Sequence, residues 1–191
     1  MTMDELARLR SSRPRSVELP IPGVEVLELP TELDARGALV ELCRATWVDP
    51  DTPVQWNAIT NRPGSLRGVH WHNGHADFIA PVHGSILAAV VDLRVGSPSE
   101  GHAEVITLDA DAPRAIVIAP GVGHGFFSAG ASVVMYGVSE YWDPDDELGV
   151  RWDDPALGIP WPPEADGALV SGRDAGFPTL AEAGERLTWP S

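Results

Sequence analysis

The densest polar chemistry lies in GSLRGVHWHNGHADFIAPVHG, residues 64–84. Within it, His70 and His72 are one residue apart, so on a β-strand both side chains point to the same face and can meet at one ligand. Asp77 follows after a short turn, and a third imidazole, His124, comes from the distant segment PGVGHGFF. Three histidines and one carboxylate suit a divalent transition metal. The same side chains could instead hydrogen-bond the polar groups of a pocket without any metal.

These side chains need a scaffold of short strands, which the rest of the chain predicts. From Val17 onward, apolar or alternating runs recur every 8 to 12 residues, separated by Gly, Pro, Asn and Asp. This spacing is typical of an all-β sandwich or barrel. With 191 residues, the chain fits one domain. We expect an N-terminal arm over 1–16, a single domain over 17–191 and a short C-terminal helix within 177–187, with Thr179 as its N-cap.

The chain is strongly acidic, with 28 acidic residues against 13 basic ones, all arginine, and a formal net charge of −15. A negative field repels phosphate backbones and anionic lipids, so we expect no nucleic-acid partner and no membrane partner. An anionic ligand must therefore be bound locally by arginine. The single cysteine, Cys43, follows an apolar run and favours a buried thiol. We expect a cytoplasmic protein, because no apolar stretch near the N-terminus suits a signal peptide.

The spacing of the histidine segment resembles the two signatures of the cupin superfamily. The first signature is matched with an aspartate in place of its usual glutamate, and the second with a serine in place of its usual asparagine. The matching positions are Gly64, His70, His72, Asp77 and Gly84 for the first, and Gly121, His124 and Ser128 for the second. The resemblance implies a cupin-type double-stranded β-helix, also called a jelly-roll barrel.

A longer resemblance, from residue 34 to residue 174, is to the family of dTDP-4-dehydrorhamnose 3,5-epimerases. The matching blocks occur in the family's order: DARGALVE, QWN, LRGVH, VVDLRVGSPSEG, APGVGHGFF, VMYGVSEYWDP, RWDDPALGIPWP and SGRDA. These are homodimeric cupin-fold enzymes that act on a nucleotide-sugar and need no metal. The resemblance therefore implies an isomerase that epimerises a dTDP-4-keto-6-deoxyhexose at C3, C5 or both, without a cofactor.

The resemblance also implies the role of individual residues. The histidine of the RGxH motif, here His70, is the base that removes the acidic proton beside the keto group, and Asp174 supports it. Tyr136 is the acid on the opposite face. Nucleotide and sugar contacts fall on Arg36, Glu41, Gln55, Asn57, Arg67, His124, Trp142 and Arg173.

Three departures from the family's pattern leave other functions open. Asp77 stands where the family has a catalytic lysine, Leu39 replaces a phenylalanine of the nucleotide site, and His72 is an additional histidine. One alternative is a metal-dependent cupin enzyme with another substrate, whose divalent transition metal is bound by His70, His72, Asp77 and His124. Another is a non-catalytic, ligand-binding relative. The short RGxHxH segment is also similar to that of the dTDP-sugar 3,4-ketoisomerases.

Overall fold

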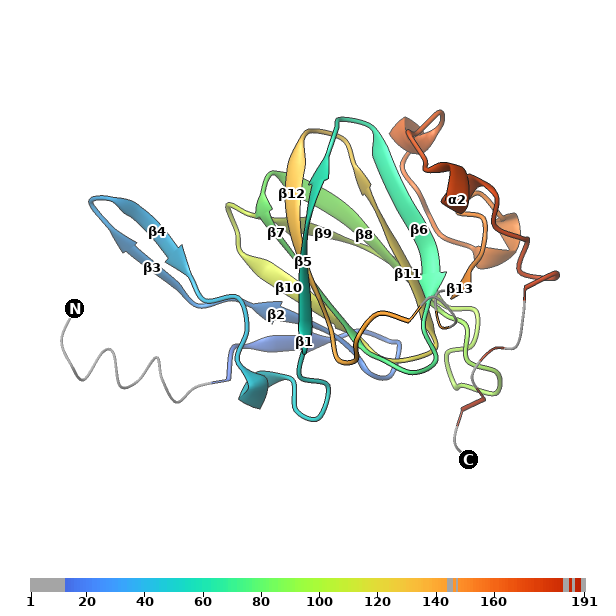
Figure 1. Ribbon diagram of the computed structural model, residues 1–191, viewed down its shortest axis with the longest axis horizontal. Coiled ribbons are helices and arrows are strands. Elements are labelled where there is room, and N and C mark those ends of the chain that lie inside the picture. The colour runs from blue at the N-terminus through green and yellow to red at the C-terminus, as the bar shows by residue number, and fades with distance from the viewer. Residues whose placement is uncertain (1–12, 144–145, 147, 184–185, 187, 190–191) are drawn as a thin grey trace.

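Two antiparallel sheets face each other and form a barrel in the computed structural model, which describes residues 13–143, 146, 148–183, 186 and 188–189 (Figure 1). The first sheet has the strand order β1-β2-β10-β7-β12-β5 and the second β13-β6-β11-β8-β9. The strands of the first are β1 Ser16–Glu18, β2 Val24–Glu28, β5 Gln55–Asn61, β7 Asp77–His83, β10 Arg114–Ile118 and β12 Ser132–Val138; those of the second are β6 Ser65–Trp71, β8 Ser85–Asp92, β9 Ala103–Asp109, β11 Val122–Ser128 and β13 Leu148–Gly149. The predicted all-β jelly-roll fold is confirmed.

The main core lies between the two sheets and follows from the alternation of each strand. Ile79 and Ile116 from the first sheet belong to the same buried cluster as Ile86, Val90 and Phe126 from the second. The residues of β7 that point away from this core, Phe78 and Ala80, belong to a separate cluster on the outer side of the first sheet. Polar side chains that alternate with these core residues can therefore face the interior of the barrel.

The segment after β12 covers the outer face of the second sheet. Trp152 and Trp161 pack against a cluster that contains Leu66 of β6 and Phe127 of β11. Short helices interrupt this covering segment: the 3-10 helices η3 Pro155–Leu157 and η4 Pro163–Ala165, and the α-helix α2 Gly172–Ala175. The segment thereby brings α2, which carries Asp174, against β6.

A two-stranded hairpin projects from the barrel (Figure 1). It consists of β3 Thr31–Asp34 and β4 Gly37–Val40, which among the described residues pair only with each other, and is followed by the 3-10 helix η1 Ala45–Trp47. Leu33 and Leu39 on this hairpin are 77% and 70% exposed. In contrast, Cys43 just beyond it packs against the outer core cluster, and burial raises the pKa of its thiol to about 11.

The chain termini differ in part from expectation. Residues 1–12 of the predicted arm lie outside the described residues, and β1 already begins at Ser16. Thr179 does bind the carboxylate of Glu182, but the hydrogen bonds close a turn; the short helix is α2, which precedes the predicted 177–187 range. Part of that range lies outside the described residues. None of the described helices is long and apolar enough to cross a membrane.

Candidate active site

A break in the pairing of β6 with β11 turns two side chains of β6 toward the same space. His124 pairs with His70, whereas the next residue, Gly125, pairs with Gly68, so one residue of β6 is left over. Such a β-bulge changes the face that the adjoining side chains occupy. Arg67 and His70 are three residues apart and would lie on opposite faces of a regular strand, yet both line one cavity.

Two glycines permit the close approach of these strands. Gly68 has a φ of +113°, and a Cβ at this position would lie 2.7 Å from Cα of Gly125 and 2.8 Å from the carbonyl oxygen of His124. A Cβ on Gly125 would lie 2.5 Å from the carbonyl oxygen of Arg67. Because only glycine has no Cβ, these two positions bring the rings of His70 and His124 to 6.5 Å between centroids.

The cavity between the sheets has a volume of about 140 Å³. Tyr136 reaches it from β12 in the first sheet, and His70 reaches it from β6 in the second. The predicted common direction of His70 and His72 is observed, and Trp71 between them is buried on the outer face. The cavity is lined by Ile59, Arg67, His70, His72, Ile79, His124, Gly125, Phe126, Tyr136 and Arg173.

His70 and Asp174 form the pair that the sequence predicted. Nε2 of His70 lies 3.1 Å from Oδ1 of Asp174, and the other oxygen, Oδ2, accepts a hydrogen bond from the backbone N–H of Gly68 at 3.1 Å. An ionised carboxylate can only accept, so in the hydrogen bond to Asp174 the proton lies on Nε2, which is also 3.1 Å from Nη2 of Arg173. Nδ1 is then the basic nitrogen of the imidazole.

The charge on Asp174 is strongly favoured in the folded protein. Its side chain is buried, which alone would raise its pKa, but the hydrogen bond and charge of His70 lower the pKa well below the usual range. The Gly68 N–H and Arg173, whose Nε lies 3.1 Å from Oδ1, act in the same direction. Asp174 is therefore an anion at neutral pH, and as a hydrogen-bond acceptor it fixes the tautomer of His70.

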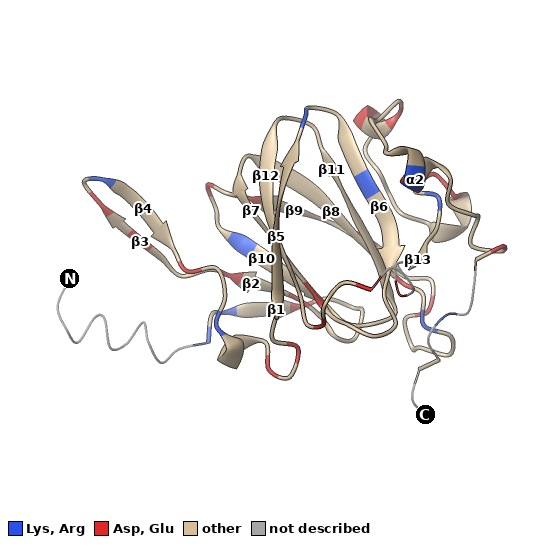
Figure 2. Ribbon diagram, in the orientation of Figure 1, with Lys and Arg blue, Asp and Glu red and all other residues tan. Residues whose placement is uncertain are grey.

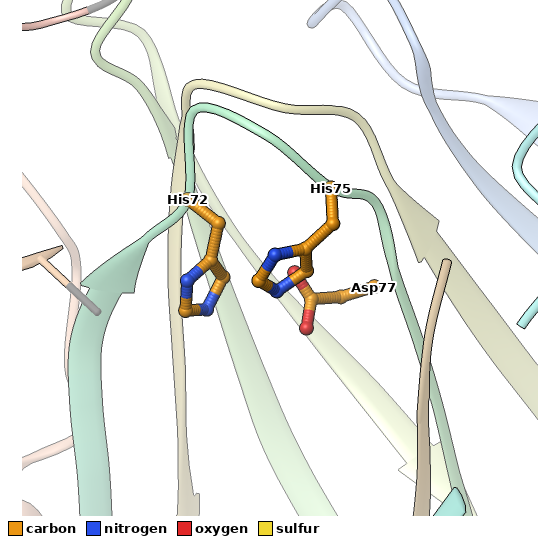
Figure 3. A group of neighbouring side chains, drawn as sticks. All are labelled: His72, His75 and Asp77. Atoms are coloured by element: carbon orange, nitrogen blue, oxygen red, sulfur yellow. The ribbon is translucent and has the colours of Figure 1, made fainter. Parts of the chain in front are cut away.

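A second group of titratable side chains lies beside the cavity. The ring of His72 stacks on that of His75 with 4.0 Å between centroids, and the carboxylate of Asp77, at the start of β7, lies beside His75 (Figure 3). Burial lowers the pKa of His72 to about 4; the charge of Asp77 opposes this shift, and the neighbouring histidines add to it. His72 is thus a neutral imidazole at physiological pH.

This group differs from the four metal ligands that the sequence suggested. Nε2 of His124 lies 3.7 Å from Oδ2 of Asp77, so these two predicted ligands do come together with His72. His70 does not join them, because its Nε2 is bound to Asp174. His75 is grouped with His72 and Asp77 instead.

Three of the predicted nucleotide contacts meet on one rim of the barrel. Gln55 and Asn57 alternate with exposed residues along β5, on the same face as Ile59, which lines the cavity. The side-chain oxygen of Gln55 accepts a hydrogen bond from the backbone N–H of Trp142, whose side chain is half-exposed. The backbone at Trp142 is therefore held next to the two amides.

Two other predicted contacts lie away from the cavity. Arg36 is at the tip of the projecting hairpin, where its guanidinium pairs with Asp34 and is almost fully exposed. Glu41 follows the hairpin and pairs with Arg44. Within one chain, neither side chain lines the cavity around His70.

Basic groups near the cavity are few and local. Arg67 and Arg173 both line it, and Nε of Arg67 donates to the amide oxygen of Asn61 at 2.9 Å, which fixes its direction. Figure 2 shows basic residues on β6 and at α2, whereas acidic residues are spread over many loops.

Residues 18–182 match the sequence profile described as dTDP-4-dehydrorhamnose 3,5-epimerase.

The chain belongs to this family. A dTDP-4-dehydro-6-deoxyglucose 3-epimerase of a Streptomyces species is 39% identical over 142 residues, which cover 72% of this chain and 71% of that protein. The dTDP-4-dehydrorhamnose 3,5-epimerase of Neisseria gonorrhoeae is 33% identical over 174 residues, which are 87% of this chain but only 53% of that protein. The chain thus spans about half the length of this second relative.

The family's fold is also seen in solved structures. The crystal structure of ChmJ, a 3'-monoepimerase from Streptomyces bikiniensis in complex with dTDP-quinovose, superposes with a TM-score of 0.79 and 32% sequence identity. The superposition covers 89% of this chain and 88% of ChmJ. The two proteins therefore share the barrel fold over most of their length.

Three residues around the site of this epimerase family member were not singled out from the sequence. The ring of Phe177 meets that of His70 edge-on at 5.6 Å between centroids, and Asp146 binds the loop that holds His75. His75 is in the same polar segment as His70, so its residue type was a usable signal. Phe177 and Asp146 are more than 70 residues from their partners, and nothing local marks them.

Proposed function

We propose that this protein epimerises a dTDP-4-keto-6-deoxyhexose at C3, C5 or both. The observation that carries the proposal is the His70–Asp174 pair, which presents an imidazole to the same cavity that Tyr136 lines from the opposite sheet. A base and an acid on two sides of one cavity are what inversion of a carbon centre requires.

The proposed reaction is a proton removal followed by a proton return. The C4 keto group acidifies the adjacent C–H, and Nδ1 of His70 takes the proton while Nε2–H stays bound to Asp174. The electron pair moves into the C4 oxygen to give an enolate, and Tyr136 donates a proton to the same carbon from the other face. The anionic Asp174 stabilises the imidazolium that forms, since it faces the positive ring directly.

The nucleotide end of the substrate would be bound by groups on the rim. Arg67 and Arg173 supply forked positive charge suited to diphosphate oxygens. Trp142 offers a half-exposed ring on which a base can stack, and Gln55 and Asn57 offer amides that can hydrogen-bond it. Because the chain as a whole is acidic, with a net charge of −15, the diphosphate would bind at these two arginines and thereby orient the ligand.

A homodimer would explain the position of the hairpin, and we include it in the proposal. Leu33 and Leu39 are exposed on a ribbon that pairs with no other strand of the chain in the described residues. Burying such side chains is favourable, so we expect a second copy of the chain to bury them in a dimer interface. In that arrangement Arg36 and Glu41 would contact the nucleotide in the partner's cavity.

The test is exchange of substrate hydrogens with solvent deuterium. The dTDP-4-keto-6-deoxy sugar is incubated with enzyme in D₂O, and deuterium at C3 and C5 is measured by mass spectrometry and NMR. The native chain should incorporate deuterium, and His70→Asn should reduce the rate by roughly 10²–10⁴-fold while its circular dichroism is unchanged. His83→Asn, at the exposed end of β7, is the matched control. Absence of exchange with folded native protein would refute the proposed reaction.

A further inference from the structure

His72, which lines the cavity, lies close to His75 and Asp77. Each can offer one ligand atom, and these atoms all lie within 4.8 Å of one another. All three side chains are buried, and Figure 3 shows the two stacked rings with the carboxylate of Asp77 beside His75. Ligands around tetrahedral zinc are about 3.3 Å apart, given Zn–N lengths near 2.0–2.1 Å, so the ligand atoms would move together by up to about 1.5 Å, and the stacked rings would turn, when an ion binds.

The imidazoles are held in the orientation that metal ligands usually have. Nδ1 of His72 lies 3.0 Å from the carbonyl oxygen of Asp146, and Nδ1 of His75 lies 3.3 Å from Oδ2 of the same residue. Nδ1 of His124 lies 3.2 Å from the carbonyl oxygen of Val122. An oxygen partner on one ring nitrogen fixes the tautomer and leaves the other nitrogen to a metal.

Nε2 of His75 is buried without a hydrogen-bond partner among the described residues, which destabilises the folded state. The residue as a whole is 4% exposed. A buried polar atom without a partner disfavours folding unless a ligand, ion or water satisfies it. This nitrogen points toward the carboxylate of Asp77 (Figure 3), where a cation would contact both.

We propose that this protein binds one divalent first-row transition metal ion, of the zinc type, through His72, His75 and Asp77. We place His124 as the fourth ligand: its Nε2 lies 3.7 Å from Oδ2 of Asp77, although it is outside the group whose ligand atoms are all within 4.8 Å of one another. Three imidazoles and one carboxylate match the ligand preference of Zn²⁺ and its neighbours. The site differs from the one expected from sequence, since His75 replaces His70.

The site goes beyond the proposed epimerase function and does not depend on it. Since His72 and His124 also line the cavity, a bound ion would face the space in which a substrate carbonyl would lie. It would supply positive charge to a chain that contains no lysine. His70 and Asp174 remain a separate pair.

The experiment measures metal binding directly. Full-length protein without an affinity tag is stripped with a chelator and titrated with Zn²⁺ by calorimetry and with Co²⁺ by visible absorption. We expect one equivalent of Zn²⁺ and the intense absorption of four- or five-coordinate Co²⁺. Asp146→Asn should weaken Zn²⁺ binding by about 10–100-fold, since outer partners contribute that much. His75→Gln and Asp77→Asn should weaken it further.

Controls separate this site from surface binding. His83→Gln should bind as the native chain does, and thermal unfolding in the absence of metal shows whether each variant is folded. Substoichiometric binding by folded native protein would overturn the proposal, whatever the variants do. So would binding that persists in His75→Gln and is lost in His102→Gln, since His102 pairs with Glu104 on the surface. Deuterium exchange by the stripped protein is read separately and tests only the epimerase proposal.

Discussion

Asp174 contacts β6 at two points, with Oδ1 3.1 Å from Nε2 of His70 and Oδ2 3.1 Å from the backbone nitrogen of Gly68. One carboxylate thereby fixes both the imidazole and the strand that carries it, although 104 residues separate His70 from Asp174. Ser171 adds a further anchor, because its hydroxyl oxygen accepts a hydrogen bond from the backbone N–H of Asp174 at 3.0 Å. The base and its support therefore behave as one rigid unit.

Changing Tyr136 to phenylalanine should separate the two proton transfers. His70 would still remove the proton and return it to the same face, so deuterium exchange persists, while formation of the epimer slows by roughly 10²–10⁴-fold because the opposite acid is missing. Exchange and epimer are measured in the same NMR sample. Tyr141→Phe, at a ring that is 74% exposed, is the control. If deuterium exchange and epimer formation slow by the same factor, Tyr136 has a packing role and is not the acid.

Replacing Asp174 with asparagine should change how stability depends on pH. The pKa of Asp174 is lower in the folded state than its unfolded value near 3.9, so its stabilising effect is present above that pH and is lost as the pH falls below it. Urea unfolding from pH 6 to pH 3 should show a steeper loss for the native chain. At pH 7, loss of the charged acceptor should cost about 1.5–3 kcal/mol.

The exposed Asp111 provides a control for this pH dependence. We call the fall in the free energy of unfolding between pH 6 and pH 3 the acid limb. Asp111→Asn should leave this acid limb as steep as in the native chain. Asp92, whose pKa is lowered to about 2 by bonds from Arg94 and two serines that outweigh its burial, contributes the same background to every variant. Identical acid limbs for the native chain and Asp174→Asn would contradict the assigned charge.

Alanine at Gly68 should destabilise the fold more than alanine at Gly64. Both glycines have positive φ, +113° and +78°, so each substitution carries a backbone penalty of about 1–2 kcal/mol. Only at Gly68 would the new Cβ collide with Gly125, which adds about 1–3 kcal/mol of overpacking. The free energies of unfolding in urea measure the difference. Equal losses would show that β6 and β11 can separate without cost.

If the hairpin of each chain reaches the partner's cavity, dimers that combine two different inactive variants should recover activity. If Arg36 acts in the partner's cavity, His70→Asn and Arg36→Ala chains are each weakly active, but a heterodimer of the two has one intact site. Co-expressed, differently tagged chains purified as heterodimers should epimerise substrate far faster than either variant. If Arg36 acts within its own chain, the heterodimer stays as inactive as the variants. A monomeric native protein in light scattering would also contradict the hypothesis.

The sequence by itself determined the fold class and the pairing partners of the proposed base. Short alternating runs with glycine and proline between them indicated an all-β sandwich or barrel, and the resemblance to the cupin signatures implied the jelly-roll barrel. The common direction of His70 and His72 followed from the period of a strand, and the His70–Asp174 pair and Tyr136 came from the motifs of a resembling family.

Tertiary structure decided what local patterns cannot encode. The bulge that turns Arg67 and His70 to one side depends on the pairing of two distant strands. The exchange of His70 for His75 beside Asp77 arose because Asp174, from the far end of the chain, occupies Nε2 of His70. The distance of Arg36 from the cavity likewise reflects a hairpin that pairs only with itself. Sequence spacing fixes which face a side chain takes, whereas contacts between remote segments fix which partner it meets.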